Sequence, residues 1–319
     1  MSVAPEEAVW NLLRGPLTAR VMAVVAELDV AGALAEGPRP AAEVAAEVGA
    51  DAGALYRFLR ALASEGVFVE EEPGVFGNTP ASELLGSDGG WHAFAQLFGG
   101  VFYRGLTELD ASGEASFPRA LGTDFWSWLA QNADERALFD RAMEQGKAQR
   151  VERFAPIAWR GDETVVDVGG GNGSLLVALI DRHPGLRGIV FDLPETVRDE
   201  GVLGNRIEFV EGDFFERVPE GDVYVLSTIL HDWDDEHATR ILQTIRAAAP
   251  AGARLLVIDA VVPPGNEPGG GKWLDLLMLA LARGKERDER QWRELLAAGG
   301  FEPVAFHDGL IEAVPAART

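Results

Sequence analysis

The stretch Val165-Val-Asp-Val-Gly-Gly-Gly-Asn-Gly-Ser174 decides the fold, because a strongly apolar strand ends within it and glycine follows. Its three valines suit a strand that is covered on both faces, and the apolar run over residues 175–180 then predicts a helix. Glycine lets the main chain turn with positive φ and approach a ligand closely. The turn also directs the unpaired N–H groups at the helix N-terminus toward that ligand. The stretch therefore predicts a strand–turn–helix cofactor site.

The spacing of the glycines indicates which cofactor binds. A dinucleotide fingerprint, G-x-G-x-x-G, closes helix against strand with its last small residue, and Ser174 holds that place here. The chain instead alternates Asp167, Gly169, Gly171 and Gly173, a pattern that resembles the first motif of methyltransferases dependent on S-adenosylmethionine (SAM). A carboxylate at the turn favours a cationic ammonium and sulfonium over a pyrophosphate. The alternative is a tight turn with a purely structural role.

Length and composition describe a globular chain. Its 319 residues can hold one large domain and a small one, and 47% hydrophobic with 25% charged residues is ordinary for such proteins. No apolar stretch approaches the ~20 residues of a membrane helix. Glu6 and Glu7 stand where a signal peptide would carry basic residues, and zero cysteines rule out disulfides and thiol chemistry. We expect a cytoplasmic protein without a membrane partner.

Residues 1–90 carry the pattern of a small winged-helix module. Helices are expected over 41–48 and 51–65, and strands over 66–70 and 74–77 with a hairpin turn between them. Helix-turn-helix followed by a two-stranded wing is the architecture of many DNA-binding regulators. The fold alone therefore leaves DNA binding and a dimerisation or lid role open.

The charge of the chain argues against nucleic acid as a partner. The net charge of −23 repels phosphate backbones. In the second helix, Arg57 and Arg60 are matched by Asp51 and Glu65, and the wing tip is the acidic run 70–72. We therefore favour a dimerisation or lid role for this module.

The rest of the chain divides into a helical part and an α/β part. Residues 91–160 are mostly helical and rich in aromatic clusters, which suit either a core or dimer interface or the wall of a pocket for a flat substrate. In residues 161–319, strands and helices alternate, which predicts a Rossmann-like α/β domain with a mostly parallel sheet and helices on both faces. The expected strands are 164–168, 187–191, 206–210, 222–228 and 254–261, with one closing strand near 301–306.

Two acids follow the second and third expected strands. Asp192 lies 19 residues after Gly173, which suits bonding to a ribose diol, and Asp213 with Phe214 could contact an adenine base. Ligands of such sheets bind beyond the carboxyl ends of the strands, where these residues are expected. The alternative for each acid is the cap of a following helix. Turn, acid and acid on three successive strands favour an adenosyl cofactor.

Five motifs together resemble one known family. VVDVGGGNGS, FDLPETV, EGDFF, LHDWDDE and GKERDERQW occur in the order found in the SAM-dependent small-molecule O-methyltransferases related to plant caffeic acid and chalcone methyltransferases, and to their bacterial natural-product relatives. The resemblance covers nearly the whole chain. It implies a winged-helix dimerisation domain (1–90), a helical linker that contributes to the substrate pocket and dimer interface (91–160) and a SAM-binding catalytic domain (161–319). It also implies a homodimer.

His231 is the candidate general base. It follows the fourth expected strand, at the carboxyl edge of the sheet. A phenol has a pKa of ~10, so only about one part in 1,000 is ionised at pH 7, and a histidine base accelerates such reactions by ~10²–10⁴-fold. The alternative is a loop residue beside a helix that Asp232 or Asp234 caps. The other four histidines, which we interpret as structural, are His92, His183, His237 and His307.

The resemblance assigns partners to this base. It implies that His231 deprotonates the substrate hydroxyl, that Asp232 helps to orient the substrate, and that Glu286 and Asp259 support the imidazole. The family carries glutamate at the position of Asp259, so the shorter side chain makes its contact with His231 less certain than that of Glu286.

Further positions concern the substrate and the cofactor. By resemblance, Met143 and Met278 sandwich an aromatic acceptor, and Phe139 is their neighbour. Thioethers pack well against ring faces, although gap-filling core is the alternative. Ser227 stands where many relatives carry a lysine that contacts the cofactor, and serine keeps a polar hydroxyl there but lacks the charge.

The expected reaction transfers the methyl group of SAM to a hydroxyl of a planar phenolic natural product, and yields a methyl ether and S-adenosylhomocysteine (SAH). No metal is expected, because alignment and one base suffice. The alternatives are a SAM-binding relative with hydroxylating or decarboxylating chemistry, a winged-helix regulator that senses a small molecule, and an NAD oxidoreductase.

Overall fold

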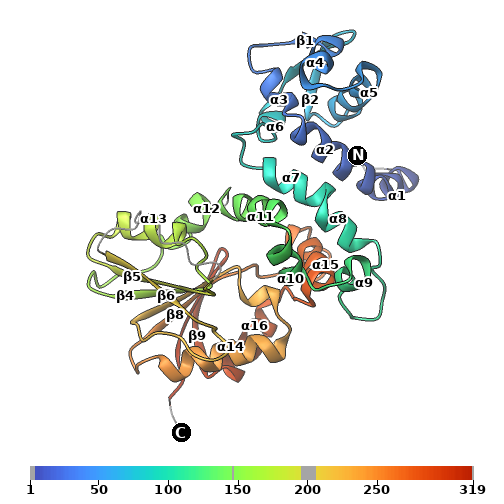
Figure 1. Cartoon of the computed structure of the whole chain (residues 1–319). Helices are drawn as coiled ribbons and strands as arrows, with labels where there is room; N and C mark the ends of the chain where they lie inside the picture. Colours follow the sequence, from blue (N-terminus) through green and yellow to red (C-terminus); the bar gives the residue numbers. More distant parts are fainter. Residues whose placement is uncertain (1–3, 146, 195–205, 318–319) are drawn as a thin grey trace. The chain divides into compact units, whose positions relative to one another are not determined.

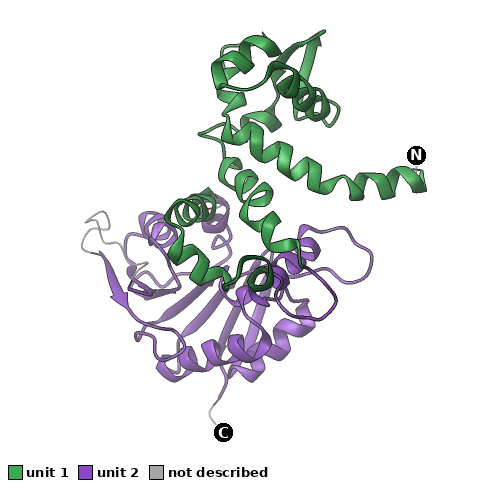
Figure 2. Ribbon diagram, turned by 45° about the vertical axis from the view of Figure 1, so that its right-hand side comes forward, with its two compact units in different colours: residues 1–108, 117–146 green, residues 109–116, 147–319 purple. Residues whose placement is uncertain are grey.

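The computed structural model describes residues 4–145, 147–194 and 206–317 (Figure 1). The chain forms two compact units (Figure 2). Unit 1 comprises Met1–Glu108 and Phe117–Gly146, and unit 2 comprises Leu109–Ser116 and Lys147–Thr319. The division into 1–90, 91–160 and 161–319 with their separate roles stays a prediction. No described helix has the length and apolar character needed to cross a membrane.

Unit 1 is mostly helical and carries one small antiparallel sheet. The predicted helix pair is present, and the Asp51 side chain caps the second helix by accepting from the Ala54 N–H at 2.8 Å. The turn of the hairpin is shorter than predicted, because β2 continues to Glu72 and leaves Pro73 and Gly74 between the strands. The sheet order is β1-β3-β2. The elements are α1 (Pro5–Leu13), α2 (Gly15–Glu27), α3 (Val30–Ala33), β1 (Arg39–Pro40), α4 (Ala41–Val48), α5 (Ala52–Ala63), β2 (Phe68–Glu72), β3 (Val75–Asn78), α6 (Pro80–Glu83), α7 (His92–Gly99), α8 (Val101–Leu106), α9 (Phe117–Leu121), α10 (Phe125–Gln131) and α11 (Ala133–Gln145).

Unit 2 contains a seven-stranded sheet of order β6-β5-β4-β7-β8-β10-β9. The first five of these strands are mutually parallel, and β10 is antiparallel to both of its neighbours. The predicted Rossmann-like fold class is therefore confirmed. The elements are α12 (Lys147–Glu152), β4 (Thr164–Val168), α13 (Ser174–Arg182), β5 (Arg187–Asp192), β6 (Ile207–Glu211), β7 (Val223–Ser227), the 3₁₀ turn η2 (Leu230–Asp232), α14 (Asp235–Ala248), β8 (Arg254–Ile258), α15 (Gly270–Ala282), α16 (Glu289–Ala298), β9 (Phe301–His307) and β10 (Leu310–Pro315).

Both faces of this sheet are buried, which explains the apolar strands. Side chains alternate between two cores: Tyr224 and Leu226 of β7 face one, and Val223 and Val225 face the other. The first core receives α14 and α16, and the second receives α13 and the segment that begins with α12 (Figure 1). Covered on both faces, the sheet exposes its chemistry only at its edges and strand ends.

One strand prediction in unit 2 is wrong at its end, and another is correct but incomplete, since the predicted closing strand is present as β9. The fifth strand ends at Ile258 and not at Val261, which forms only an isolated bridge with Arg287. The closing strand is a hairpin, because β9 is followed by β10 across the two residues Asp308 and Gly309. Asp-Gly between two apolar runs is a strong signal for a hairpin, so the second strand could have been predicted from the sequence. The other predicted strands agree with the structure to within one residue at each end.

Candidate active site

Five strand ends line one edge of the parallel sheet. Since β4 to β8 run in the same direction, the residues at their carboxyl ends meet along that edge. In chain order these ends carry Gly169, Asp192, Asp213, Ser227 and Asp259. The edge thus gathers the predicted cofactor residues and one of the predicted partners of the base.

The glycine turn after β4 needs glycine at its first position. Gly169 has φ +73°, and a Cβ placed there would lie 2.5 Å from Cδ1 of Ile229. Its N–H donates to the carbonyl of Phe191 at 2.8 Å, which fixes the start of the turn against β5. Gly173, also with positive φ, then begins α13. The turn with positive φ that leads into a helix is present as predicted, and its approach to a ligand stays a prediction.

Asp192 holds this turn from the neighbouring strand. Its Oδ2 accepts from the N–H of Gly171 at 2.8 Å, and its Oδ1 accepts from the N–H of Leu193 at 2.7 Å. The residues after 194 in FDLPETV, and with them the helix that Asp192 was alternatively expected to cap, lie outside the described residues. Bonding of Asp192 to a ribose stays a prediction. The structure places the Asp192 side chain directly beside the glycine turn.

Asp213 and Phe214 lie beyond β6. Oδ1 of Asp213 accepts from the N–H of Phe215 at 2.7 Å and so stabilises a local turn. The alternative role as a helix cap is wrong, because residues 214–216 form a turn and not a helix. The Phe214 ring packs edge-on against Trp233 at 6.1 Å between centroids. One of its ring carbons lies 3.8 Å from a Cβ placed at Gly169. Phe214 therefore borders the glycine turn, and its predicted contact with an adenine base stays a prediction.

Two of the predicted cofactor residues at this edge have buried polar atoms without a hydrogen-bond partner among the described residues. They are Oδ2 of Asp167, in β4, and Oγ of Ser227, at the end of β7. Burial, together with repulsion from Asp192 and against the attraction of Arg150, raises the pKa of Asp167 to about 7. Buried polar atoms without partners are costly, and a cationic ligand would satisfy this carboxylate. The edge therefore fits an amino-acid ammonium such as that of SAM.

His231 lies in η2 with Glu286 beside it. Nδ1 of the imidazole is 2.7 Å from Oε1 of Glu286, and both side chains are almost fully buried. Asp259 stops short: its Oδ1 is 3.8 Å from Nδ1, beyond hydrogen-bond distance, and neither of its oxygens has a partner among the described residues. Oδ1 of Asp232 is 3.6 Å from Nε2. The four side chains predicted to act together therefore lie close to one another. The cap of α14 is Asp234 and not Asp232.

The three acids make His231 a stronger base. Burial lowers the pKa of His231, but the charges of Asp259 and Asp232 and the bond to Glu286 outweigh it and raise the pKa to about 10. Burial raises the pKa of Asp259 to about 7 and that of Asp232 to about 6, against the attraction of the imidazolium. The cluster therefore favours the protonated imidazolium form of His231.

The other predicted histidines do not join this cluster. His92 bonds the Leu85 carbonyl through Nδ1 at 2.8 Å, and His237 bonds Asp234 at 2.7 Å near the surface of α14. Within residues 4–145, 147–194 and 206–317, no three acids or histidines are arranged to hold a metal ion. Metal-free chemistry stays a prediction.

The predicted substrate residues come from both units. Met278 lies on α15 in unit 2 and is 8% exposed. Met143 and Phe139 lie on α11 in unit 1, where the Phe139 ring packs edge-on against Phe125 at 5.6 Å between centroids. Their role around an acceptor stays a prediction.

Sequence reasoning missed Arg287, which lies next to Glu286 and has no exposed surface. It stands in the charge run 285–290, from which the sequence analysis selected Glu286 alone. The burial of a single charged residue within such a run produces no periodic pattern in the sequence from which it could be predicted. The only hint is its place directly beside a predicted site residue.

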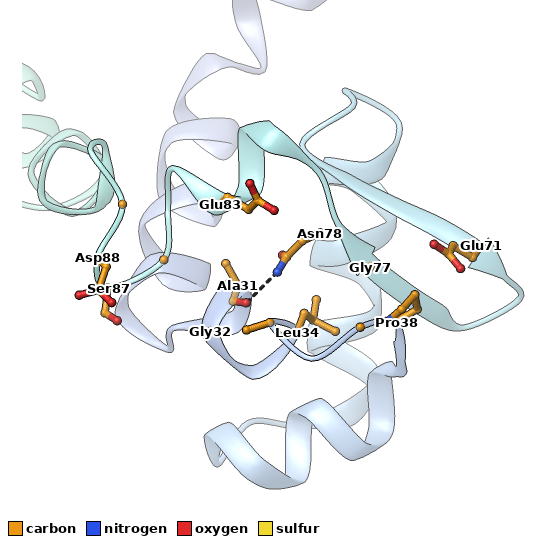
Figure 3. A pocket seen from close by; sticks show the side chains of 14 residues that line it. Ala31, Gly32, Leu34, Pro38, Glu71, Gly77, Asn78, Glu83, Ser87 and Asp88 are labelled. Atoms are coloured by element: carbon orange, nitrogen blue, oxygen red, sulfur yellow. Dashed lines mark hydrogen bonds between the residues drawn. The ribbon is translucent and has the colours of Figure 1, made fainter.

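Unit 1 also has an open hollow, between α3, the turn before β1, β3 and residues 83–89 (Figure 3). Asn78 points toward α3 and donates to the Ala31 carbonyl at 2.8 Å, while Glu71 and Asp88 lie at the rim. None of the predicted site residues lines it. The chemistry described above belongs to the sheet edge of unit 2.

Comparison with known proteins identifies the family. The family model described as an O-methyltransferase domain matches residues 103–302, and the model described as an O-methyltransferase dimerisation domain matches residues 10–88. The phenazine O-methyltransferase PhzM of Lysobacter antibioticus is 38% identical, with 96% of this chain and 95% of that protein covered. The O-demethylpuromycin-O-methyltransferase of Streptomyces alboniger is 37% identical over 97% of this chain and 89% of its own.

Solved structures agree. The crystal structure of LaPhzM has a TM-score of 0.89 and 36% identity, and covers 98% of this chain and 100% of its own. NcsB1 from neocarzinostatin biosynthesis, solved with SAH and 1,4-dihydroxy-2-naphthoic acid, has a TM-score of 0.80 and 35% identity over 94% of this chain and 96% of its own. By fold, by family model and by relatives along almost its whole length, this chain belongs to the O-methyltransferase family and is a SAM-dependent O-methyltransferase.

Proposed function

We propose that this enzyme methylates a hydroxyl group of a planar aromatic natural product, with His231 as the general base. The observation that carries the proposal is the 2.7 Å contact between Nδ1 of His231 and Oε1 of Glu286. A carboxylate at that distance accepts the Nδ1–H and leaves Nε2 as the nitrogen free to take a proton. Relatives that act on phenazine or are solved with a naphthoic acid support a planar acceptor.

The cofactor site is proposed along the sheet edge. SAM, when bound there, supplies a methyl group on a positively charged sulfur. The glycine turn would present its N–H groups, and the unsatisfied carboxylate of Asp167 would meet a cationic group. The residues proposed to hold the cofactor are Asp167, Gly169, Gly171, Gly173, Asp192, Asp213, Phe214 and Ser227.

The proton moves to His231. Nε2 takes the proton of the substrate hydroxyl. The oxygen lone pair thereby freed would form the new bond to the methyl carbon while the bond between that carbon and sulfur breaks, which would leave its electron pair on sulfur and SAH as the second product. The imidazolium that results is stabilised by Glu286 through Nδ1 and by the charge of Asp259 at 3.8 Å. Asp232, on the Nε2 side, is placed to orient the hydroxyl. Met278, Met143 and Phe139 are proposed to contact the acceptor ring.

A homodimer is proposed through unit 1. No residue of α1 is buried, yet the helix is apolar, and five large side chains of α1 and the start of α2 are 56–70% exposed. A helix of nine residues does not stand alone in water without an apolar face to bury. A second copy is the occupant that the matched dimerisation model supports. The five are Val9, Trp10, Leu12, Leu13 and Leu17.

The test compares His231→Gln with His237→Gln. His237 also bonds a carboxylate at 2.7 Å but lies near the surface, so it is a matched control. The wild type is given SAM and aromatic hydroxy acids of graded size, among them 1,4-dihydroxy-2-naphthoic acid, and the products are weighed by mass spectrometry. A gain of one CH₂ indicates methylation, whereas added oxygen or lost CO₂ would indicate the alternative chemistry, which the relatives do not favour.

We expect H231Q to bind SAH as the wild type does in calorimetry but to lose at least about 100-fold in kcat, the contribution of a general base. H237Q should retain activity. Turnover of H231Q at the wild-type rate would remove His231 from the reaction.

A further inference from the structure

Arg287 is a charged side chain with no exposed surface. Its Nε donates to Oδ1 of Asp235 at 2.9 Å, and Cζ lies 5.4 Å from the centre of the Trp292 ring. A guanidinium removed from water costs several kcal/mol unless its donors are satisfied, so each of its bonds has a structural consequence. The remaining bonds go to main-chain carbonyls.

These carbonyls bracket the turn that carries the base. Nη1 donates to the carbonyl of Leu230 at 3.0 Å, and Nη2 donates to the carbonyl of Trp233 at 2.9 Å. Between these two residues lie only His231 and Asp232. One rigid planar group thus fixes both ends of η2, whose side chains include the proposed base.

The same residue fixes the segment with Glu286. Nη1 also donates to the carbonyl of Lys285 at 3.1 Å, and the N–H of Lys285 donates to the carbonyl of His231 at 2.8 Å. A Cβ added at Gly284 would lie 2.3 Å from that His231 carbonyl oxygen, so the two segments are in close contact. The alignment of Glu286 with His231, 55 positions apart in the chain, is therefore set by main-chain bonds around Arg287.

Arg287 reaches the third segment of the cluster through its neighbours. Its carbonyl accepts from the N–H of Val262 at 2.9 Å. Trp292, the ring beside the guanidinium, donates through Nε1 to the carbonyl of Ala260 at 3.0 Å, directly after Asp259. The segments with His231, Glu286 and Asp259 are thus joined at one buried arginine–tryptophan pair.

We propose that Arg287 is a positioning residue that holds His231 at hydrogen-bond distance from Glu286, and thereby sets the orientation of the imidazole toward the substrate hydroxyl. Each nitrogen of its guanidinium donates to a protein group, so the role assigned to it is to position other residues. This inference rests on the proposed role of His231 as the base. Lysine at this position would retain the charge but not the planar fork that bonds two carbonyls at once.

The test compares Arg287→Lys with Arg254→Lys. Arg254 is the matched control, because it also pairs with a carboxylate, that of Glu163, and lies 5.5 Å from a tryptophan ring, that of Trp159. It stands at the start of β8, whereas the cluster lies beyond the end of that strand. Both variants, the wild type and H231Q are labelled with ¹⁵N-histidine. The five histidines allow the ring N–H signal of His231 to be assigned by its loss in H231Q.

We expect R287K to lose or shift the signal of the His231 Nδ1–H that donates to Glu286, and R254K to retain it. With the acceptor of highest turnover, R287K should lose at least about tenfold in kcat, because displacement of a catalytic group by ~1 Å can cost on the order of 100-fold. Its dissociation constant for SAH should remain within about twofold of the wild type, since uniform binding is untouched. R254K should lower Tm only.

An R287K protein with the wild-type His231 signal and kcat would overturn the inference. So would an R287K protein that fails to fold where R254K folds, because Arg287 would then serve the fold alone. Wild-type turnover in H231Q would instead refute the proposed base, and leaves the ring signal as the independent measure of positioning.

Discussion

Replacing Asp259 by asparagine should lower the pKa of His231. Asp259 is the carboxylate whose charge contributes most to raising that pKa, yet it forms no hydrogen bond with the imidazole. The substitution therefore removes a charge without breaking the 2.7 Å contact to Glu286. Asparagine is nearly the same size as aspartate, so the packing around β8 is retained.

The distance sets the size of the effect. Oδ1 of Asp259 lies 3.8 Å from Nδ1 of His231. Two unit charges about 4 Å apart attract by ~1 kcal/mol in a water-like medium and by ~4 kcal/mol at the effective dielectric constant of a protein surface. At ~1.4 kcal/mol for each pKa unit, removal of Asp259 should lower the pKa of His231 by about 1–3 units. Because the base must be neutral to accept a proton, the rising limb of the pH–rate profile should move to lower pH by the same amount.

The assay is the pH dependence of kcat/KM for the acceptor, which reports the pKa values of essential groups in the free enzyme and substrate. The His231 ring nitrogens, titrated by NMR, give the pKa directly. The control is Asp234→Asn, which changes the surface pair with His237 and should leave the profile unchanged. A limb that stays in place, or that moves to higher pH in D259N, would refute the electrostatic role of Asp259.

Three further outcomes are expected. The pKa of Asp259 rises to about 7 in the folded state from an ordinary 3.8. Its ionisation therefore destabilises the folded state more and more as pH rises between those values, so the Tm of D259N should rise relative to that of the wild type over this range. Gly171→Ala should cost about 1–2 kcal/mol of unfolding free energy for its left-handed backbone, measured by urea denaturation, and Gly169→Ala should cost more because its Cβ would also collide with a neighbour. Leu13→Glu should give a monomer in light scattering, whereas Val304→Glu, equally a change of an exposed apolar residue but in unit 2, should remain a dimer; two dimers would place the interface elsewhere.

The strand ends were predictable because parallel topology and residue type act together. Once β4 and β5 were identified as parallel strands, Gly169 and Asp192 had to lie at one edge, and the structure bonds Asp192 to the glycine turn. The expectation for Asp259 came instead from the family resemblance: its side chain is one methylene shorter than the glutamate of relatives, and it lies 3.8 Å from the imidazole.

Burial within a charge run was not predictable. Lys285, Glu286 and Arg287 are consecutive charged residues, yet Lys285 is half-buried and the other two are buried. Their partners, among them the carbonyls of Leu230 and Trp233, are more than 50 positions away. Propensity and periodicity report on neighbours within a few residues, so a contact set by chain segments that meet only in the folded sheet leaves no local pattern.

The proposed acid–base group comes from unit 2 alone, since His231, Asp232, Asp259, Glu286 and Arg287 all belong to it. Phe139 and Met143, by contrast, belong to unit 1. Chimaeras that exchange α8–α11 with those of a relative should therefore alter which acceptor is methylated and leave the rising limb of the pH–rate profile unchanged. In the proposed assignment, changes in unit 1 can therefore widen the range of acceptors, while unit 2, which also carries Met278 and Asp232, retains the machinery for proton transfer.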